Sequence, residues 1–65
     1  MMKPKTNVTV KLIGEDGDAF YILGKVERAL TDAGYIEEAK NYMNEATSGD
    51  YNHLVLVTME YVDVE

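Results

Sequence analysis

The spacing of apolar residues between positions 19 and 33 constrains the fold more than any other feature of the sequence. These residues recur three or four positions apart, as in a helix with one buried face: Ala19, Ile22, Leu23, Val26, Leu30 and Ala33. Asp18 is a favourable N-cap residue, and Gly34 stands where a helix commonly ends. The pattern therefore predicts a helix over residues 19–33. Gly24 lowers its helix propensity by about 1 kcal/mol relative to Ala and is a candidate for close approach of another backbone.

The segment before this helix alternates between polar and apolar residues, as a half-buried strand does. We predict a strand over residues 6–13, followed by a turn at residues 14–17. The residues on the buried face of the strand are Val8, Val10 and Leu12. A lone strand leaves its backbone hydrogen-bonding groups without partners. The partner is expected to be either the chain end around residues 61–64 or the same strand of another copy.

The second half of the chain contains a shorter predicted helix and an ambiguous segment. The helix covers residues 35–46, and its inner face holds Ile36, Ala39, Met43 and Ala46. Residues 51–64 fit either a strand rich in β-branched residues or a helix with one stripe of Leu54, Val57 and Tyr61. Because Asp50 is a favourable cap, we predict a helix from about residue 50 to residue 59 and an extended end at residues 62–64.

These segments predict one small α/β (α+β) domain over residues 1–65, in the order strand–helix–helix–helix with an extended C-terminal end. The alternative is β-α-α-β, if the last segment is a strand. A chain of this length without cysteine has a small core and no disulfides to support it. We therefore expect a homodimer or a higher homo-oligomer. The candidate interface residues are Val8 and Val10 of the strand and Phe20, Tyr21 and Gly24 of the first helix.

The charge of the chain is negative and unevenly distributed. Six Lys and Arg against twelve Asp and Glu give a formal charge of -6. Residues 1–11 carry three bases and no acid, whereas residues 41–65 carry five acids and no base. This balance argues against general nucleic-acid binding, which needs clustered Lys and Arg, and it suits a basic partner. Glu60 and Asp63 are the candidate contacts for such a partner.

Two loops before predicted helices are candidate anion sites, because backbone amides at helix N-termini can bind phosphate groups. The candidate ligand-binding residues are Gly14, Gly17, Thr47, Ser48 and Gly49 in the loops, with Lys11, Lys25 and Arg28 as cations. Carboxylates in the same loops oppose an anion. Ser48, Asp50 and His53 have the residue types of a hydrolytic triad, but the chain offers little scaffold for an oxyanion hole. We therefore predict no catalytic residues, and neither a metal nor a cofactor.

Three stretches resemble a group of small uncharacterised proteins of bacteriophages and integrated mobile elements. They are KLIGEDGDAFYILG at residues 11–24, ATSGDYNHL at residues 46–54 and MEYV at residues 59–62. The resemblance implies an accessory protein that acts by binding. We expect a non-enzymatic binding module that antagonises a host (defence) function by binding a host protein. The alternatives are an oligomer that sequesters a small phosphorylated or nucleotide signal, and a structural oligomerisation protein. No apolar run could span a membrane, so the expected location is the cytoplasm of a bacterial host.

Overall fold

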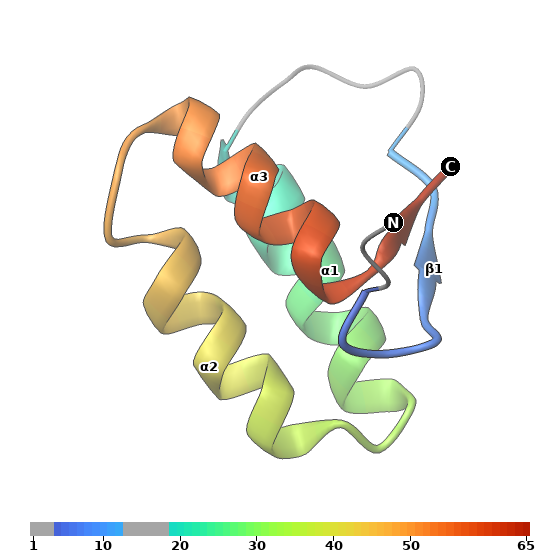
Figure 1. Ribbon diagram of the computed structural model, residues 1–65. Coiled ribbons are helices and arrows are strands. Elements are labelled where there is room, and N and C mark those ends of the chain that lie inside the picture. The colour runs from blue at the N-terminus through green and yellow to red at the C-terminus, as the bar shows by residue number, and fades with distance from the viewer. Residues whose placement is uncertain (1–3, 13–18) are drawn as a thin grey trace.

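The computed structural model describes residues 4–12 and 19–65. Within them the chain forms a strand, three helices and a second strand (Figure 1). Their bounds are β1 (Thr9–Val10), α1 (Ala19–Asp32), α2 (Ile36–Ala46), α3 (Tyr51–Tyr61) and β2 (Asp63–Val64). This confirms the predicted order strand–helix–helix–helix with an extended C-terminal end. The strand interpretation of the last segment is wrong over α3.

Local sequence signals explain where the helices begin and end. After α1, Gly34 takes a φ of 91°, a conformation that glycine adopts without steric cost. Asp50 caps α3, because its carboxylate accepts a hydrogen bond of 2.9 Å from the backbone N–H of His53. The predicted N-cap Asp18 and the predicted turn at residues 14–17 lie outside the described residues.

The first strand pairs with the end of its own chain. β1 and β2 are parallel, with Thr9 opposite Asp63 and Val10 opposite Val64. Hydrogen bonds of 2.9 Å join the backbone N–H of Asp63 to the carbonyl of Val8, and that of Glu65 to the carbonyl of Val10. Of the two partners that the sequence left open, the structure shows the chain end. The unpaired strand is therefore no longer a reason to expect self-association, and the small core is the reason that remains.

The strand is much shorter than the predicted range of residues 6–13. The backbone N–H groups of Lys5 and Thr6 donate to the carbonyls of Glu60 and Tyr61, at 2.8 and 3.2 Å. These carbonyls belong to the last turn of α3, where helix carbonyls lack partners within the helix. The N-terminal segment therefore begins by closing a helix end, and it pairs as a strand only where its partner becomes extended. Ile13 lies outside the described residues.

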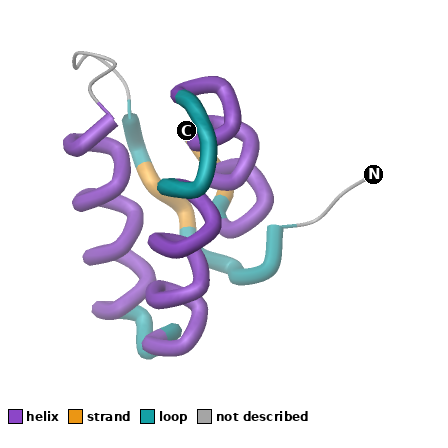
Figure 2. Tube along the Cα trace, turned by 90° about the vertical axis from the view of Figure 1, so that its left-hand side faces the viewer, coloured by secondary structure: helices purple, strands orange, loops and turns teal. Residues whose placement is uncertain are grey.

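The helices lie on one side of the strand pair (Figures 1 and 2). Residues of all three helices and of β1 contribute to the core. Within the described residues the core consists of Val10, Ile22, Leu23, Val26, Leu30, Ala39, Tyr42, Ala46, Leu54, Val57, Tyr61 and Val62. The rings of Tyr42 and Tyr61 meet edge to face, with centroids 5.5 Å apart.

The inner face of α2 differs from the prediction. Ala39 and Ala46 are buried as expected, but Ile36 is 51% exposed and Tyr42 is completely buried. The buried stripe consists of Ala39, Tyr42 and Ala46. Their spacing is that of a helix, but the buried face is rotated slightly about the helix axis from the predicted face. Tyr42 can occupy the core because its hydroxyl finds a partner there, Thr58 of α3.

Candidate functional site

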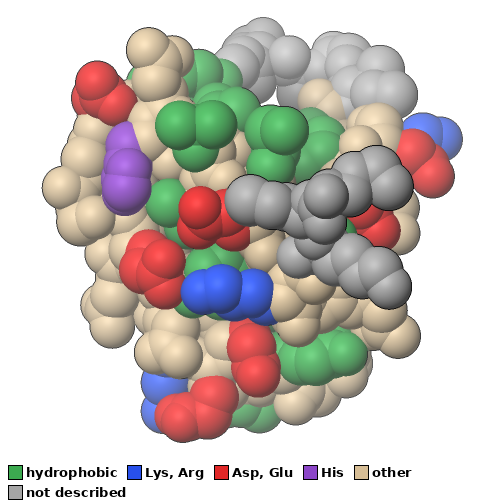
Figure 3. Space-filling model, viewed as in Figure 1, with side chains coloured by type: hydrophobic (Ala, Val, Ile, Leu, Met, Phe, Trp, Pro, Cys, Tyr) green, Lys and Arg blue, Asp and Glu red, His purple; other side chains and the backbone are tan. Residues whose placement is uncertain are grey.

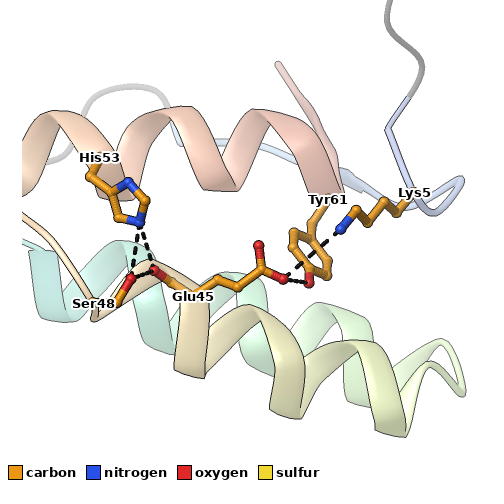
Figure 4. A network of polar contacts seen from close by, with 5 residues as sticks. All are labelled: Lys5, Glu45, Ser48, His53 and Tyr61. Atoms are coloured by element: carbon orange, nitrogen blue, oxygen red, sulfur yellow. Dashed lines mark hydrogen bonds and ion pairs between the residues drawn. The ribbon is translucent and has the colours of Figure 1, made fainter.

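A polar network joins the end of α2 to both ends of α3 (Figure 4). The carbonyl oxygen of Glu45 lies 2.7 Å from Oγ of Ser48 and 2.8 Å from Nε2 of His53. Oγ of Ser48 also lies 3.2 Å from Nε2 of His53. Ser48 and His53, which the sequence singled out as members of a triad, are therefore in contact.

The protons in this network are not placed for nucleophilic catalysis. A carbonyl oxygen can only accept, so Nε2 of His53 must carry a proton. Ser48 directs its own hydroxyl proton at the same carbonyl, so this nitrogen does not take the proton of the serine. Asp50 bonds the backbone N–H of His53 and caps the helix. In this arrangement the three residues join two helix ends.

The side chain of Glu45 continues the network toward the N-terminal segment. Its carboxylate accepts a hydrogen bond from the Tyr61 hydroxyl and lies 3.9 Å from Nζ of Lys5. This ammonium group also lies 4.6 Å from the centroid of the Tyr61 ring. Burial, together with the hydrogen bond to Glu45 and its charge, raises the pKa of the Tyr61 hydroxyl. The N-terminal segment is thereby tied to α2 as well as to β2.

The structure brings part of the predicted anion site together. Thr47 and Gly49 line a hollow of about 270 Å³ beside the first turn of α1. The other lining residues are Ala19, Phe20, Leu23, Ala46, Asp50, Tyr51 and Leu54. Ser48 is adjacent in sequence but does not line the hollow.

The predicted cations are not part of this hollow. Lys11, Lys25 and Arg28 do not line it, and Nζ of Lys25 lies 3.0 Å from the Tyr21 hydroxyl. Asp50, an acidic residue, does line it, which disfavours an anion. Gly14 and Gly17 lie outside the described residues.

Gly49 is explained by packing. A Cβ atom at this position would lie 2.7 Å from Cγ of His53, which is closer than such atoms approach. The glycine therefore lets the imidazole pack against the loop and reach the Glu45 carbonyl. Gly24 differs, since a Cβ there would meet nothing within 4 Å among the described residues. The close approach expected at Gly24 does not occur within the described part of the chain.

The predicted interface residues have different surroundings. Val10 is buried in the core of its own chain, and Val8 packs against that core. Phe20 is 83% exposed, and Tyr21 is half-buried. Glu60 is half-buried and Asp63 is exposed. In this conformation Val10 is therefore not available to a second copy.

A second, larger hollow lies between α3, α1 and the strand pair. It measures about 520 Å³ and is lined by Pro4, Leu12, Ile22, Val55, Thr58, Met59, Val62, Asp63 and Val64. Beside it, α3 turns apolar residues outward: Val55 is half-buried, Leu56 is 61% exposed and Met59 is 57% exposed. Hydrophobic side chains gather over the upper part of α3 in Figure 3. We call Val55, Leu56 and Met59 the α3 outer face, and the hollow beside them the α3 groove.

The sequence prediction missed the α3 outer face, although a signal for it was present. With Leu54, Val57 and Tyr61 assigned to the buried stripe, a helix over this segment must carry its other apolar residues on the opposite side. Apolar residues on both sides of a helix predict that both sides are covered.

The described residues give no further site by residue type. Among them, no group of three His, Asp or Glu side chains could hold a metal ion. The acidic residues Glu15, Asp16 and Asp18 lie outside this part of the chain. None of the described helices is long and apolar enough to cross a bilayer.

Neither the family models, the curated proteins nor the solved structures with which the chain was compared gave a match. The resemblance to bacteriophage and mobile-element proteins therefore stays an expectation. Function has to be argued from the surface and its chemistry.

Proposed function

We propose that this chain is a non-enzymatic protein-binding module and that the α3 outer face, with the α3 groove, is its docking surface. The observation that carries the proposal is that α3 is apolar on both sides. Leu54, Val57 and Tyr61 are buried in the core, while Leu56 and Met59 on the other side face the solvent. A helix at the surface of a globular protein has a polar outer side.

The gain from covering this surface is large for so small a protein. Burying a Leu or Met side chain contributes about 1.5–3 kcal/mol, so Leu56 and Met59 together offer several kcal/mol to a partner. The groove adds further apolar surface from Leu12, from Val64 of β2 and from Ile22 of α1. Contiguous apolar patches on the surface of a protein mark sites of interaction.

The resemblance to bacteriophage proteins supports a host protein as the partner. The chain would then antagonise a host function by occupying a surface that the host protein needs. Sequestration of a nucleotide has less support, because Lys25 and Arg28 lie outside the hollow that holds the loop residues. A second copy could also cover the α3 outer face, and the experiment below distinguishes it from a host protein.

The test compares L56E/M59E with the control I36E, which changes an exposed apolar residue of α2. Glu is a good helix former, so both variants should fold. Each tagged protein is incubated with bacterial lysate, and its mass in solution is measured in parallel. A host protein that is retained by the natural chain and by I36E, but lost from L56E/M59E, supports the proposal. If L56E/M59E retains the same proteins as the natural chain, the proposal is wrong.

A further inference from the structure

The charges around the α3 outer face are acidic. Glu60 follows Met59 on α3, Asp63 lines the groove, and Glu65 follows Val64. Residues 41–65, which contain α3 and β2, include no Lys or Arg. An apolar surface with a rim of one sign favours a partner of the opposite sign.

Among residues 4–12 and 19–65, the nearby bases do not pair with these acids. Lys5 is held by Glu45 and by the ring of Tyr61. Lys25 lies 3.0 Å from the Tyr21 hydroxyl. Lys11 is exposed and does not line the groove. Within the described part of the chain, Glu60, Asp63 and Glu65 form no ion pair, so these carboxylates can face a partner.

The geometry favours a helix over a strand as the docking element. Val55 and Met59 are four residues apart and stand one turn above the other along α3. Such a row of side chains is the ridge against which a second helix packs. A strand would have to add to the edge of β2 that faces away from β1, where, within residues 63–65, only Val64 directs its N–H and C=O outward. That edge is too short to hold a strand firmly.

We propose that the α3 outer face binds an amphipathic helix of a partner protein that carries Lys or Arg beside its apolar stripe. The apolar stripe would pack on Leu56 and Met59 and reach into the α3 groove. The flanking cations would face Glu60 and Asp63. This inference rests on the proposed function and specifies the partner of the same site.

Electrostatics disfavours a second copy as the occupant. In a symmetric dimer the same patch of both copies meets across the axis. Pairing through the α3 outer face would bring two base-free, acidic segments together in a chain whose net charge is -6. Like charges at close range oppose association.

The test uses model helical peptides of about 14 residues, near the mean length of a protein helix. One carries an apolar stripe flanked by Lys, a second has Glu in place of Lys, and a third keeps Lys but has Ser in place of the apolar residues. Binding is followed by amide chemical shifts of the labelled full chain. We expect the first peptide alone to bind, with shifts concentrated in α3 and β2. Raising the ionic strength from about 0.05 M to about 0.5 M should weaken the binding of the first peptide roughly tenfold.

Variants of the protein separate the two contributions. At low salt, E60Q/D63N should bind the Lys peptide more weakly than the natural chain does. L56E/M59E should not bind this peptide, and I36E should bind it as the natural chain does. Equal binding of the Lys and Glu peptides, or shifts that lie elsewhere, would overturn the inference. So would a dimer of the natural chain that L56E/M59E dissociates, because a second copy would then be the occupant. The Lys peptide could fail to bind while a lysate protein is still retained by the natural chain and not by L56E/M59E. In that case the inference is wrong and the proposed function stands.

Discussion

The hydroxyl of Tyr42 donates a hydrogen bond to Oγ1 of Thr58 across the contact between α2 and α3, and the two oxygens are 2.7 Å apart. The direction follows from the second bond of Thr58, which gives its own proton to the carbonyl of Leu54 at 2.9 Å. Both side chains are buried. The polar groups at the centre of the core are thus satisfied by each other and by one helix carbonyl.

This pair predicts unequal and non-additive costs of substitution. Thr58→Val leaves the buried Tyr42 hydroxyl without an acceptor, which should lower the free energy of unfolding by about 1–3 kcal/mol. Tyr42→Phe removes the donor, while Thr58 keeps its bond to Leu54, so the expected cost is about 1 kcal/mol. The double variant should lose less than the sum of the two. Urea unfolding of the four proteins measures this, and strictly additive losses would argue against a buried bond between the side chains.

Two tyrosines predict a loss of stability at alkaline pH. Burial raises the pKa of Tyr42 above its ordinary value of 10.0, and burial with the contact to Glu45 raises that of Tyr61. Above pH 10 the unfolded chain therefore releases protons that the folded chain keeps. The contribution of these raised pKa values to the free energy of unfolding is fully present below that pH. It should be lost above it, by up to about 1.4 kcal/mol per pH unit for each tyrosine.

Urea midpoints between about pH 8 and pH 11 measure this dependence. Tyr61→Phe should be less stable near neutral pH, because it loses the bond to Glu45. Its stability should nevertheless fall less steeply at high pH. An equally steep decline in the natural chain and in this variant would show that Tyr61 is not a source of the effect.

The surroundings of Gly24 and Gly49 predict opposite effects of the same substitution. Gly49→Ala places a Cβ atom 2.7 Å from Cγ of His53, so the imidazole must leave the Glu45 carbonyl. We expect a loss of about 1–3 kcal/mol. Gly24→Ala adds a methyl group in open space within a helix and should stabilise the chain by about 1 kcal/mol.

Thermal unfolding of both variants, with the solution mass of Gly24→Ala, checks this prediction. A destabilised Gly24→Ala would contradict the open surroundings of that residue. A lower mass for that variant would reveal a contact with another chain at Gly24.

The parts of the fold that were predicted correctly depend on local physics. Each of them is determined by residues within one or two turns of a helix. They are the spacing of apolar residues in α1, the positive φ of Gly34 and the cap at Asp50. The burial of Tyr42 could not be predicted in this way, because it depends on a hydroxyl from another helix. Nor could the shortness of β1, because it depends on where α3 ends.

The candidate site was predicted only in part. Asp63 was expected at an interface and lines the α3 groove, but Leu56 and Met59 were missed. Their exposure depends on which side of α3 faces the core, and α3 is apolar on both sides. Ser48 and His53 were singled out by residue type alone, and their contact was not predicted. The role of the Glu45 carbonyl depends on proton positions that residue types do not reveal.

The accessibility of the Met59 methyl group tests the central claim most directly. With isotope-labelled methionine methyl groups and a paramagnetic agent in the solvent, exposed methyl signals broaden, and half-buried Met43 serves as the internal reference. We predict that Met59 broadens more than Met43 in the free chain and becomes protected when the Lys-bearing helical peptide is added to saturation. A Met59 signal that is already protected in the free chain, or that stays broadened with the peptide bound, would contradict the assignment of this face as the docking surface.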